Sequence, residues 1–401
     1  MTSTNELIDK EVANGSIALF EYNEFSDVKK VANGAFGTVY RTYWKCEIEL
    51  ALKEIDIPVK DNVNRFLREL KSLIEVSSHP NINKFLGITK EPSSNNYIMV
   101  LEYANQGNLR EYLKNNFKSL QWNDKARMAV DIASGLRWLH SKEIIHRDLH
   151  SKNILIHNNR LLIADFGLSK QLSGEITSDS TDDGMVPYID PQCYKVDKYV
   201  RDKKSDIYSL GVLLWEIASG YPPFLDISYF AVIRKISDGD REQLIEDAPL
   251  EYTNLYQKCW DENPNLRPNL IDVLMTLLLL PLETFDIDIK IIKLVELMEE
   301  YGILYNRYVW ISDKIKKFTP KQIRQRWVNV LNPKLCHKPL NEYEKSFIIQ
   351  WVENNKADYP LIPWKILISA MKDEFGNLRS ENMVKNFWYF WNRKSKSGNI
   401  R

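Results

Sequence analysis

Two glycines and five polar residues in the front half of the chain have the types that phosphate chemistry requires. Gly34 and Gly37 lie in a turn between strand-like runs, where the absence of side chains lets backbone N–H groups approach phosphate oxygens. Taken alone, these glycines are explained better by a plain hairpin. The polar residues follow in short motifs, in the order Lys53, Glu69, Asp148, Asn153 and Asp165. Any one of them could belong to an ordinary turn or to a surface ion pair worth less than about 1 kcal/mol, so only the ordered set is informative.

The ordered set resembles the motifs of the eukaryotic protein kinase family, and the match runs from about residue 20 to about residue 280. Lys53 ends the run Ala-Leu-Lys, Asp148 stands in His-Arg-Asp-Leu with Asn153 five residues later, and Asp165 opens Asp-Phe-Gly. The resemblance implies an enzyme that uses ATP and Mg²⁺ to phosphorylate proteins. A pseudokinase scaffold is the alternative, although no catalytic position of the family pattern is lost.

The resemblance also implies a role for each of these residues. Lys53 is expected to hold the α- and β-phosphates of ATP and to be fixed in turn by Glu69. Asn153 and Asp165 offer the oxygen ligands that Mg²⁺ prefers, and Asp148 is expected to accept the proton of the attacking hydroxyl. The residues expected to surround the bound nucleotide are Val31, Gly34, Gly37, Val39, Ala51, Lys53, Glu69, Leu101, Glu102, Ala104 and Leu155.

The acceptor hydroxyl stays open between Ser/Thr and Tyr. Trp44, the run from His146 to Asn153 and the Cys-Trp element at Cys259 resemble the tyrosine-kinase-like group of Ser/Thr kinases, which favours Ser and Thr. However, His150 stands where Ser/Thr kinases usually carry a Lys, and Lys152 stands where tyrosine kinases often carry Arg. Phosphate on one hydroxyl of the activation segment is expected to pair with Arg147 and to order that segment. The hydroxyls in question are Ser173, Thr177, Ser178, Ser180 and Thr181.

Two further positions concern the framework of the site. Asp206 matches the family residue that braces the catalytic loop. Gln192 occupies the position of a Glu that pairs with an Arg in the family, so it is expected to accept a neutral, weaker hydrogen bond from Arg267. We therefore expect this departure to lower stability without removing the chemistry.

The tail of the chain differs in charge from the front half. The formal net charge is zero for the whole chain, but residues 281–401 carry 21 Lys and Arg against 14 Asp and Glu, a net charge of +7. Six of the eleven tryptophans also lie in this tail. Two stretches share a layout of three helices, which the pattern predicts at 288–300, 310–317 and 320–331 and again at 341–354, 364–375 and 380–394.

These repeats resemble a tandem pair of Myb-type helix-turn-helix domains, which implies that the third helix of each lies in the major groove of duplex DNA. Because Asn suits adenine and Lys suits guanine, the residues expected to face base edges are Lys321, Gln325, Asn382, Lys385 and Asn386. Those expected near phosphates are Arg324, Arg326, Arg393, Lys394 and Lys396. The alternative is a three-helix module of the same fold that binds protein.

The sequence therefore predicts an α+β chain with a β-rich lobe, a helical lobe and an all-α pair of three-helix repeats. The expected parts are an N-terminal extension (1–19), a kinase domain (20–280), a linker (281–287), two Myb-like repeats (288–333 and 334–394) and a basic tail (395–401). Four widely spaced cysteines predict neither a zinc site nor a disulfide scaffold. The longest apolar run has about ten residues, whereas a membrane span needs ~20, so no membrane partner is expected. The expected compartment is the cytoplasm, with nuclear residence if the tail binds DNA.

Overall fold

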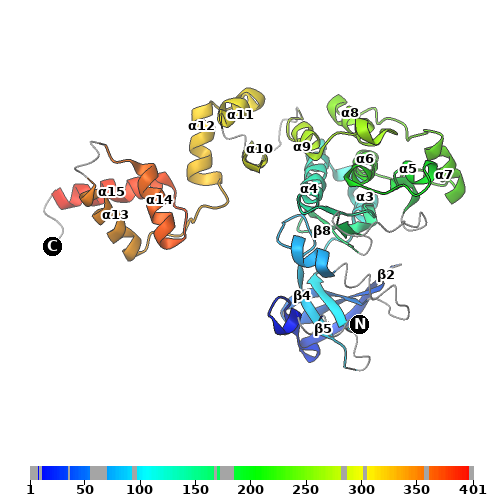
Figure 1. Ribbon diagram of the computed structural model, residues 1–401, viewed down its shortest axis with the longest axis horizontal. Helices are drawn as coiled ribbons and strands as arrows, with labels where there is room; N and C mark the ends of the chain where they lie inside the picture. The colour runs from blue at the N-terminus through cyan, green and yellow to red at the C-terminus, as the bar shows by residue number, and fades with distance from the viewer. Residues whose placement is uncertain are drawn as a thin grey trace. The chain divides into compact units, whose positions relative to one another are not determined.

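The chain divides into two compact units, Met1–Leu282 and Glu283–Arg401, and the division falls within the expected linker. The computed structural model describes residues 8, 11–34, 37–54, 70–92, 97–166, 169–171, 185–280, 287–300, 305–355 and 361–396. Figure 1 shows strands near the N-terminus and helices from the middle of the chain to its end. Within the described residues, no helix has the length and apolar character needed to cross a membrane.

The first unit begins with a sheet of six strands in the order β1-β5-β6-β4-β3-β2. The strands are β1 (Leu19–Phe20), β2 (Phe25–Gly34), β3 (Gly37–Trp44), β4 (Ile48–Glu54), β5 (Phe85–Lys90) and β6 (Tyr97–Glu102). β1 runs parallel to β5, and the other neighbours are antiparallel. One face buries a cluster of apolar side chains from two central strands: Leu50, Leu52, Ile98 and Val100. The β-rich lobe predicted from the sequence is confirmed.

The pairing of β1 with β5 brings part of the expected N-terminal extension into this sheet. Ile17 is buried, and Leu19 is the register partner of Ile88. Gly87 makes the close approach feasible, because a Cβ at this position would lie 2.2 Å from the backbone oxygen of Ala18. The sheet therefore includes residues that lie outside the kinase-like motifs.

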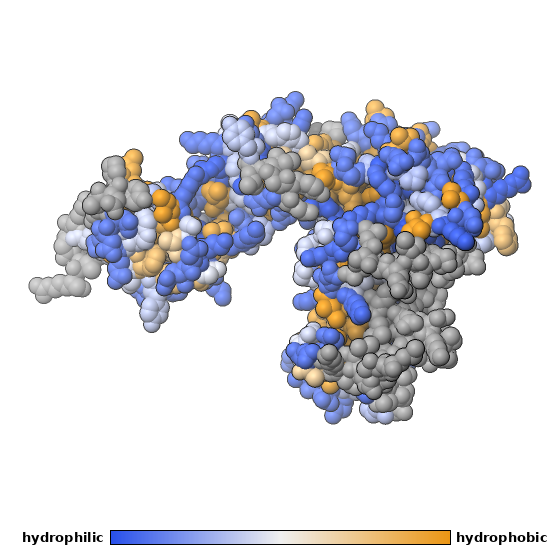
Figure 2. Space-filling view, in the orientation of Figure 1, coloured by the Kyte–Doolittle hydropathy of each residue, from blue (hydrophilic) through white to orange (hydrophobic). Residues whose placement is uncertain are grey.

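The helical lobe of the first unit surrounds one buried helix. Its helices are α3 (Leu109–Asn116), α4 (Trp122–Ser141), α5 (Gln192–Lys195), α6 (Lys203–Ser219), α7 (Tyr229–Ser237), α8 (Leu250–Cys259) and α9 (Leu270–Leu278). Short strands lie among them: β7 (Ile144–Ile145), β8 (Ile154–His157), β9 (Arg160–Ile163) and β10 (Lys170–Gln171). Asp202 caps α6, which is buried from Ser205 to Ser219. The face of this lobe visible in Figure 2 is mainly hydrophilic, with separate apolar side chains.

The described residues of the second unit form two groups of three helices. The first group is α10 (Ile287–Glu300), α11 (Arg307–Ile315) and α12 (Pro320–Arg326), and α12 continues as a π-helical turn, η6 (Trp327–Leu331). The second group is α13 (Glu342–Asn354), α14 (Trp364–Phe375) and α15 (Glu381–Lys396). Buried tryptophans, Trp327 and Trp388, anchor the third helix of each group. The predicted pair of three-helix repeats is thus observed, with helix ends shifted by up to three residues.

Candidate active site

A buried carboxylate holds the catalytic loop in place. Asp206 on α6 accepts hydrogen bonds from the backbone N–H groups of His146 and Arg147, both at 2.9 Å, and lies 2.8 Å from the His140 ring. Burial raises the pKa of the Asp206 carboxyl, but hydrogen bonding and charge from His140, together with His146, hold that pKa below its ordinary value. The carboxylate is therefore charged at neutral pH and can bind both amides. The brace that the sequence predicts at Asp206 is present.

Asp148 lies at the centre of this loop and has three polar neighbours. Its Oδ2 accepts from Nδ2 of Asn153 at 3.0 Å, and Nε2 of His150 lies 3.5 Å from its Oδ1. Burial raises the pKa of Asp148, but His150, then His146 and Asn153, outweigh this effect and lower the pKa below its ordinary value. Asp148 is consequently a carboxylate near neutral pH, as a group that accepts a hydroxyl proton must be.

The predicted phosphate and metal residues come from both lobes. Nζ of Lys53 on β4 donates to Oδ1 of Asp165 at 3.1 Å, although 112 residues separate them. The amide nitrogen of Asn153 donates to Asp148, and the amide oxygen is the atom that could serve as a metal ligand. Asp165 and Arg147 have φ angles of +63° and +71°. Residues held in this left-handed region carry backbone strain, which clusters at functional sites.

Strand register places the predicted nucleotide-binding residues on one face of the sheet. Val39 pairs with Lys53 across β3 and β4, and Ala51 pairs with Leu101 across β4 and β6. Since residues opposite each other, and residues two apart along a strand, point to the same face, these four side chains share one surface. Gly34 and Gly37 are register partners at the end of the β2–β3 hairpin.

Of the remaining residues predicted to surround the nucleotide, the structure describes four and leaves out Glu69. Glu102 ends β6 and Ala104 follows it, and both are half-buried. Leu155 lies on β8, and Val31 is 46% exposed. Glu69 and the five activation-segment hydroxyls lie outside the described residues. The Lys53–Glu69 pair and the expected phosphate contact of Arg147 therefore stay predictions.

Comparison with known proteins identifies this arrangement. Residues 25–277 match the family described as protein tyrosine and serine/threonine kinase. The chain belongs to this kinase family. Residues 292–348 match the family described as Myb-like DNA-binding domain.

Relatives of the kinase domain occur in plants and amoebae. The chain is 32% identical to "Serine/threonine-protein kinase VIK" of Arabidopsis thaliana over 63% of this chain and 59% of that protein. It is 34% identical to "Serine/threonine/tyrosine-protein kinase HT1" of the same plant over 62% of this chain and 64% of that protein. It is 29% identical to "Dual specificity protein kinase splA" of Dictyostelium discoideum over 64% of this chain and 11% of that protein. The chain thus spans less than two thirds of each of these relatives.

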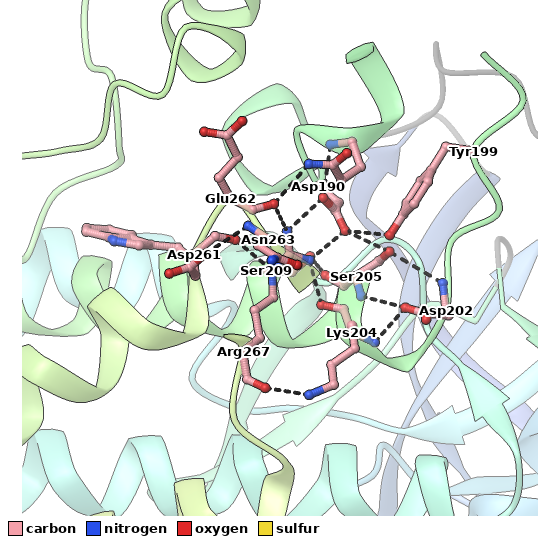
Figure 3. A network of polar contacts seen from close by, with 12 residues as sticks. Asp190, Tyr199, Asp202, Lys204, Ser205, Ser209, Asp261, Glu262, Asn263 and Arg267 are labelled. Carbon is pink, nitrogen blue, oxygen red and sulfur yellow. Dashed lines mark hydrogen bonds and ion pairs between the residues drawn. The ribbon is translucent and has the colours of Figure 1, made fainter. Parts of the chain in front are cut away.

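The kinase domain contains a buried ion pair that corrects the prediction for Gln192. Arg267 donates to both carboxylate oxygens of Asp190, at 2.6 and 2.9 Å, and neither side chain is exposed. Gln192 instead donates from Nε2 to the carbonyl of Glu262 at 2.9 Å. Figure 3 shows Asp190 and Arg267 facing each other at the centre of this network. The prediction of a weak neutral bond between Gln192 and Arg267 was wrong, because a carboxylate two residues earlier reaches the guanidinium.

A polar cluster beside the catalytic loop was not predicted from the sequence. Arg110 on α3 donates to Ser151 at 3.0 Å, to Glu216 at 3.2 Å and to the hydroxyl of Tyr188 at 2.8 Å. Tyr188 also donates to Glu216. Burial raises the pKa of Glu216 and outweighs the lowering by Arg110 and the hydrogen bonds. Four separate segments supply this cluster, so no local spacing could have revealed it.

The tail residues predicted to contact DNA lie on the third helices. Lys321 and Gln325 on α12 and Asn382 and Asn386 on α15 are exposed. Lys385 is half-buried and pairs with Glu381 at 2.5 Å, one helical turn away.

Arg326, predicted near phosphates, binds Asp288 on α10 through an ion pair. This ion pair joins the first and third helices of the first repeat. The Arg326 side chain would have to leave Asp288 before it could contact a phosphate.

Proposed function

We propose that this chain transfers the γ-phosphoryl group of ATP to Ser or Thr hydroxyls of proteins. The observation that carries the proposal is the grouping of Lys53, Asp148, Asn153 and Asp165 around a loop held by Asp206. No catalytic residue type of the family is replaced. The named relatives are serine/threonine, serine/threonine/tyrosine or dual specificity kinases.

Each of these residues has a separate role in the proposed reaction. The substrate hydroxyl oxygen forms a bond to the γ-phosphorus, the bond from that phosphorus to the bridging oxygen of ADP breaks, and ADP leaves. Asp148 accepts the hydroxyl proton, and Lys53 supplies positive charge opposite the phosphates. Asn153 and Asp165 fit Mg²⁺ because both present oxygen atoms. When bound, Mg²⁺ neutralises charge that develops on the phosphates.

Phosphorylation by the purified full-length chain tests this proposal. The chain and its Asp165→Asn and Asp148→Asn variants are incubated with labelled ATP, Mg²⁺ and a mixed protein substrate, and phosphoamino acids are separated. Loss of Asp148 should reduce the rate by about 10²–10⁴-fold, the range for a general base. The matched control is Glu262→Gln, an exposed carboxylate outside the site.

The possible outcomes distinguish a Ser/Thr kinase, a tyrosine kinase and a pseudokinase scaffold. Phosphoserine or phosphothreonine made by the parent and the control alone supports the proposal. Phosphotyrosine would reassign the acceptor. A folded parent that neither binds ATP nor labels any substrate would favour the pseudokinase scaffold.

We also propose that the tail binds duplex DNA, because of the match over residues 292–348 and the exposed polar side chains on α12 and α15. Exposed Lys321 lies on the third helix of the first repeat, and its ammonium group can neutralise phosphate or contact guanine. The Lys385–Glu381 pair does not prevent base contact, since a helical pair of this spacing contributes only about 0.2–0.5 kcal/mol.

Salt titration of binding to a labelled duplex of mixed sequence tests this second function. Each phosphate contact contributes about −0.9 to the slope of log K against log salt concentration. Lys321→Ala should reduce the slope by about that amount if the ammonium contacts phosphate. Lys345→Ala, on α13, is the matched control. Binding that is absent, or that does not respond to salt, would favour the protein-binding alternative.

A further inference from the structure

The segment that leads into α6 contacts the catalytic loop through a side chain other than Asp206. Arg201 directly precedes Asp202, the residue that caps this helix. Its Nη1 donates to the backbone carbonyl of Arg147 at 3.1 Å, although 54 residues separate the two. Arg201 is buried, with 5% of its surface exposed. A buried guanidinium therefore binds the residue immediately before Asp148.

The cap of α6 determines where this side chain begins. The carboxylate of Asp202 accepts from the backbone N–H groups of Lys204 at 2.8 Å and Ser205 at 3.3 Å, as Figure 3 shows. Such a cap satisfies N–H groups that have no acceptor within the helix. Since α6 is also buried from Ser205 to Ser219, Arg201 extends from the well-supported start of a buried helix.

Both backbone polar groups of Arg147 are bound by residues at the start of α6. Its N–H donates to Asp206 at 2.9 Å, and its carbonyl accepts from Arg201. The N–H of Asp148, which belongs to the same peptide group as that carbonyl, donates to Nδ1 of His146 at 3.3 Å. The peptide group that leads into Asp148 is thus bound at both ends, which defines its orientation.

This orientation has to be maintained by contacts, because Arg147 is strained. Its φ angle of +71° lies in the left-handed region, which is unfavourable for a residue with a side chain. A strained conformation persists only where the surrounding structure holds it. Rotation of the peptide group after Arg147 would move the carboxylate of Asp148 away from Nδ2 of Asn153, which now donates to it at 3.0 Å. The contact of Arg201 therefore bears on the direction of the Asp148 side chain.

The unpaired charge of Arg201 indicates that binding this carbonyl is its role. Burying a charge is unfavourable unless it is paired. Within the described part of the chain, Arg201 forms no ion pair with a carboxylate, and its Nη2 is buried without a hydrogen-bond acceptor. Arg267, which is also buried, differs because Asp190 neutralises it. An ion pair in the framework therefore accounts for Arg267 but not for Arg201.

We propose that Arg201 is a positioning residue for phosphoryl transfer, which holds the carbonyl of Arg147 and thereby directs the carboxylate of Asp148 toward the acceptor hydroxyl. This inference rests on the proposed kinase function. Arg201 acts through the catalytic loop, whereas the nucleotide is assigned to Lys53 and Asp165. Loss of Arg201 is therefore expected to lower the maximal rate and to leave KM for ATP unchanged.

Steady-state kinetics of the full-length chain test the proposal. The maximal rate and KM for ATP are measured for the parent, Arg201→Met, Arg201→Lys and Arg241→Met, with the mixed protein substrate in fixed excess. Methionine removes the charge at similar length, and replacing a buried charge by an apolar group of similar size often preserves folding. If Arg201→Met does not fold, Arg201→Gln takes its place, since its shorter side chain cannot extend to the carbonyl.

Arg241 is the matched control for Arg201. It also donates to backbone carbonyls in the helical lobe, those of Trp260 at 3.1 Å and Ile236 at 3.2 Å. Neither carbonyl belongs to the catalytic loop. A general loosening of the lobe would therefore appear in both arginine variants, whereas loss of the loop contact would appear in Arg201→Met alone.

Arg201→Met should lower the maximal rate about 10- to 100-fold, as expected for loss of a hydrogen bond from a charged donor. Arg201→Lys keeps a charged donor on a shorter side chain and should recover part of the rate, and Arg241→Met should match the parent. A parent-like rate for Arg201→Met would overturn the proposal. An equal loss in Arg241→Met, a change confined to KM for ATP, or no recovery in Arg201→Lys would overturn it as well.

Hydrogen exchange of the free proteins separates failure of this contact from failure of the kinase function. Arg201→Met should increase exchange in a peptide that spans His146 to Asn153, whereas Arg241→Met should not. Increased exchange in Arg201→Met, when the parent phosphorylates no substrate, would refute the kinase function and with it the role of Arg201 in the reaction, while leaving the contact itself established. Unchanged exchange in Arg201→Met would refute the contact.

Discussion

Replacing Asp190 by Asn should destabilise the kinase domain far more than replacing Gln192. Asp190 accepts two hydrogen bonds from Arg267 and further bonds from Ser205 at 3.0 Å and Tyr199 at 3.3 Å. The asparagine has similar shape, but it carries no charge and presents an NH₂ group to groups that donate. It therefore leaves the guanidinium of Arg267 buried without its anion.

The magnitude follows from the complete burial of this pair. Removing one member of a buried ion pair costs about 3–5 kcal/mol, because the remaining charge is not compensated. At about 2–4 °C per kcal/mol, the thermal midpoint of Asp190→Asn should fall by roughly 6–20 °C. Gln192→Ala removes one neutral hydrogen bond and should cost about 0.5–1.5 kcal/mol.

Thermal unfolding of the full-length chain, followed by near-ultraviolet circular dichroism, measures this difference. Glu262→Gln is a control for loss of a carboxylate, since its pair with Lys195 is largely exposed and contributes about 0–1 kcal/mol. Two results would contradict this expectation: a midpoint for Gln192→Ala as low as that for Asp190→Asn, or a midpoint for Asp190→Asn equal to that of the Glu262→Gln control. Either result would mean that Arg267 depends on a partner other than Asp190.

Two other substitutions and one labelling reaction test packing and charge elsewhere in the kinase domain. Arg110→Leu removes the cation beside buried Glu216 and should cost about 2–3 kcal/mol near neutral pH, less than for a wholly buried pair because the guanidinium is 22% exposed. The pKa of Glu216, already raised by burial, rises further in this variant. Urea unfolding should therefore show the full loss above that pKa, and below the unfolded value of about 4.3 only the part due to the hydrogen bonds of Arg110 with Ser151 and Tyr188. Burial raises the pKa of Cys259 to about 12, so its thiolate fraction at about pH 8 falls roughly a thousandfold. A thiol reagent should therefore label exposed Cys46 before the chain unfolds and Cys259 only afterwards. Gly211→Ala would place a Cβ 2.7 Å from the Cβ of Cys259, and the resulting overpacking should cost about 1–3 kcal/mol in the same unfolding assay.

Local patterns predicted the helices and several strands well. The predicted run 341–354 became α13 (Glu342–Asn354), and 364–375 coincides with α14, because apolar spacing marks the face that packs. The pairing of β1 with β5 could not be predicted in this way. It joins residues about 70 positions apart in sequence, and its main requirement is that Gly87 has no side chain.

In the site, too, residues in short motifs could be predicted, whereas contacts between distant segments could not. Asp148, Asn153 and Asp165 stand in short motifs, so their types and order could be recognised before their geometry was known. The cluster of Arg110 with Glu216 has no such motif, because its members are brought together only by the fold. One signal was overlooked: Glu381 precedes Lys385 by four residues, a spacing that favours an ion pair on a helix.

Gln192 and His150 both depart from the kinase family pattern, but they lie in different surroundings, one in the framework beside Arg267 and the other beside Asp148. The guanidinium of Arg267 requires an anion at one place, and Asp190 provides it from a position two residues before Gln192. A missing charge in one sequence position therefore does not mean a missing charge in the fold. His150 is a different case, since its ring lies 3.5 Å from the carboxylate of Asp148 itself. A change of side chain there alters the surroundings of the residue proposed to accept the proton, so we expect it to act on the chemistry, whereas the change at Gln192 acts on the framework alone.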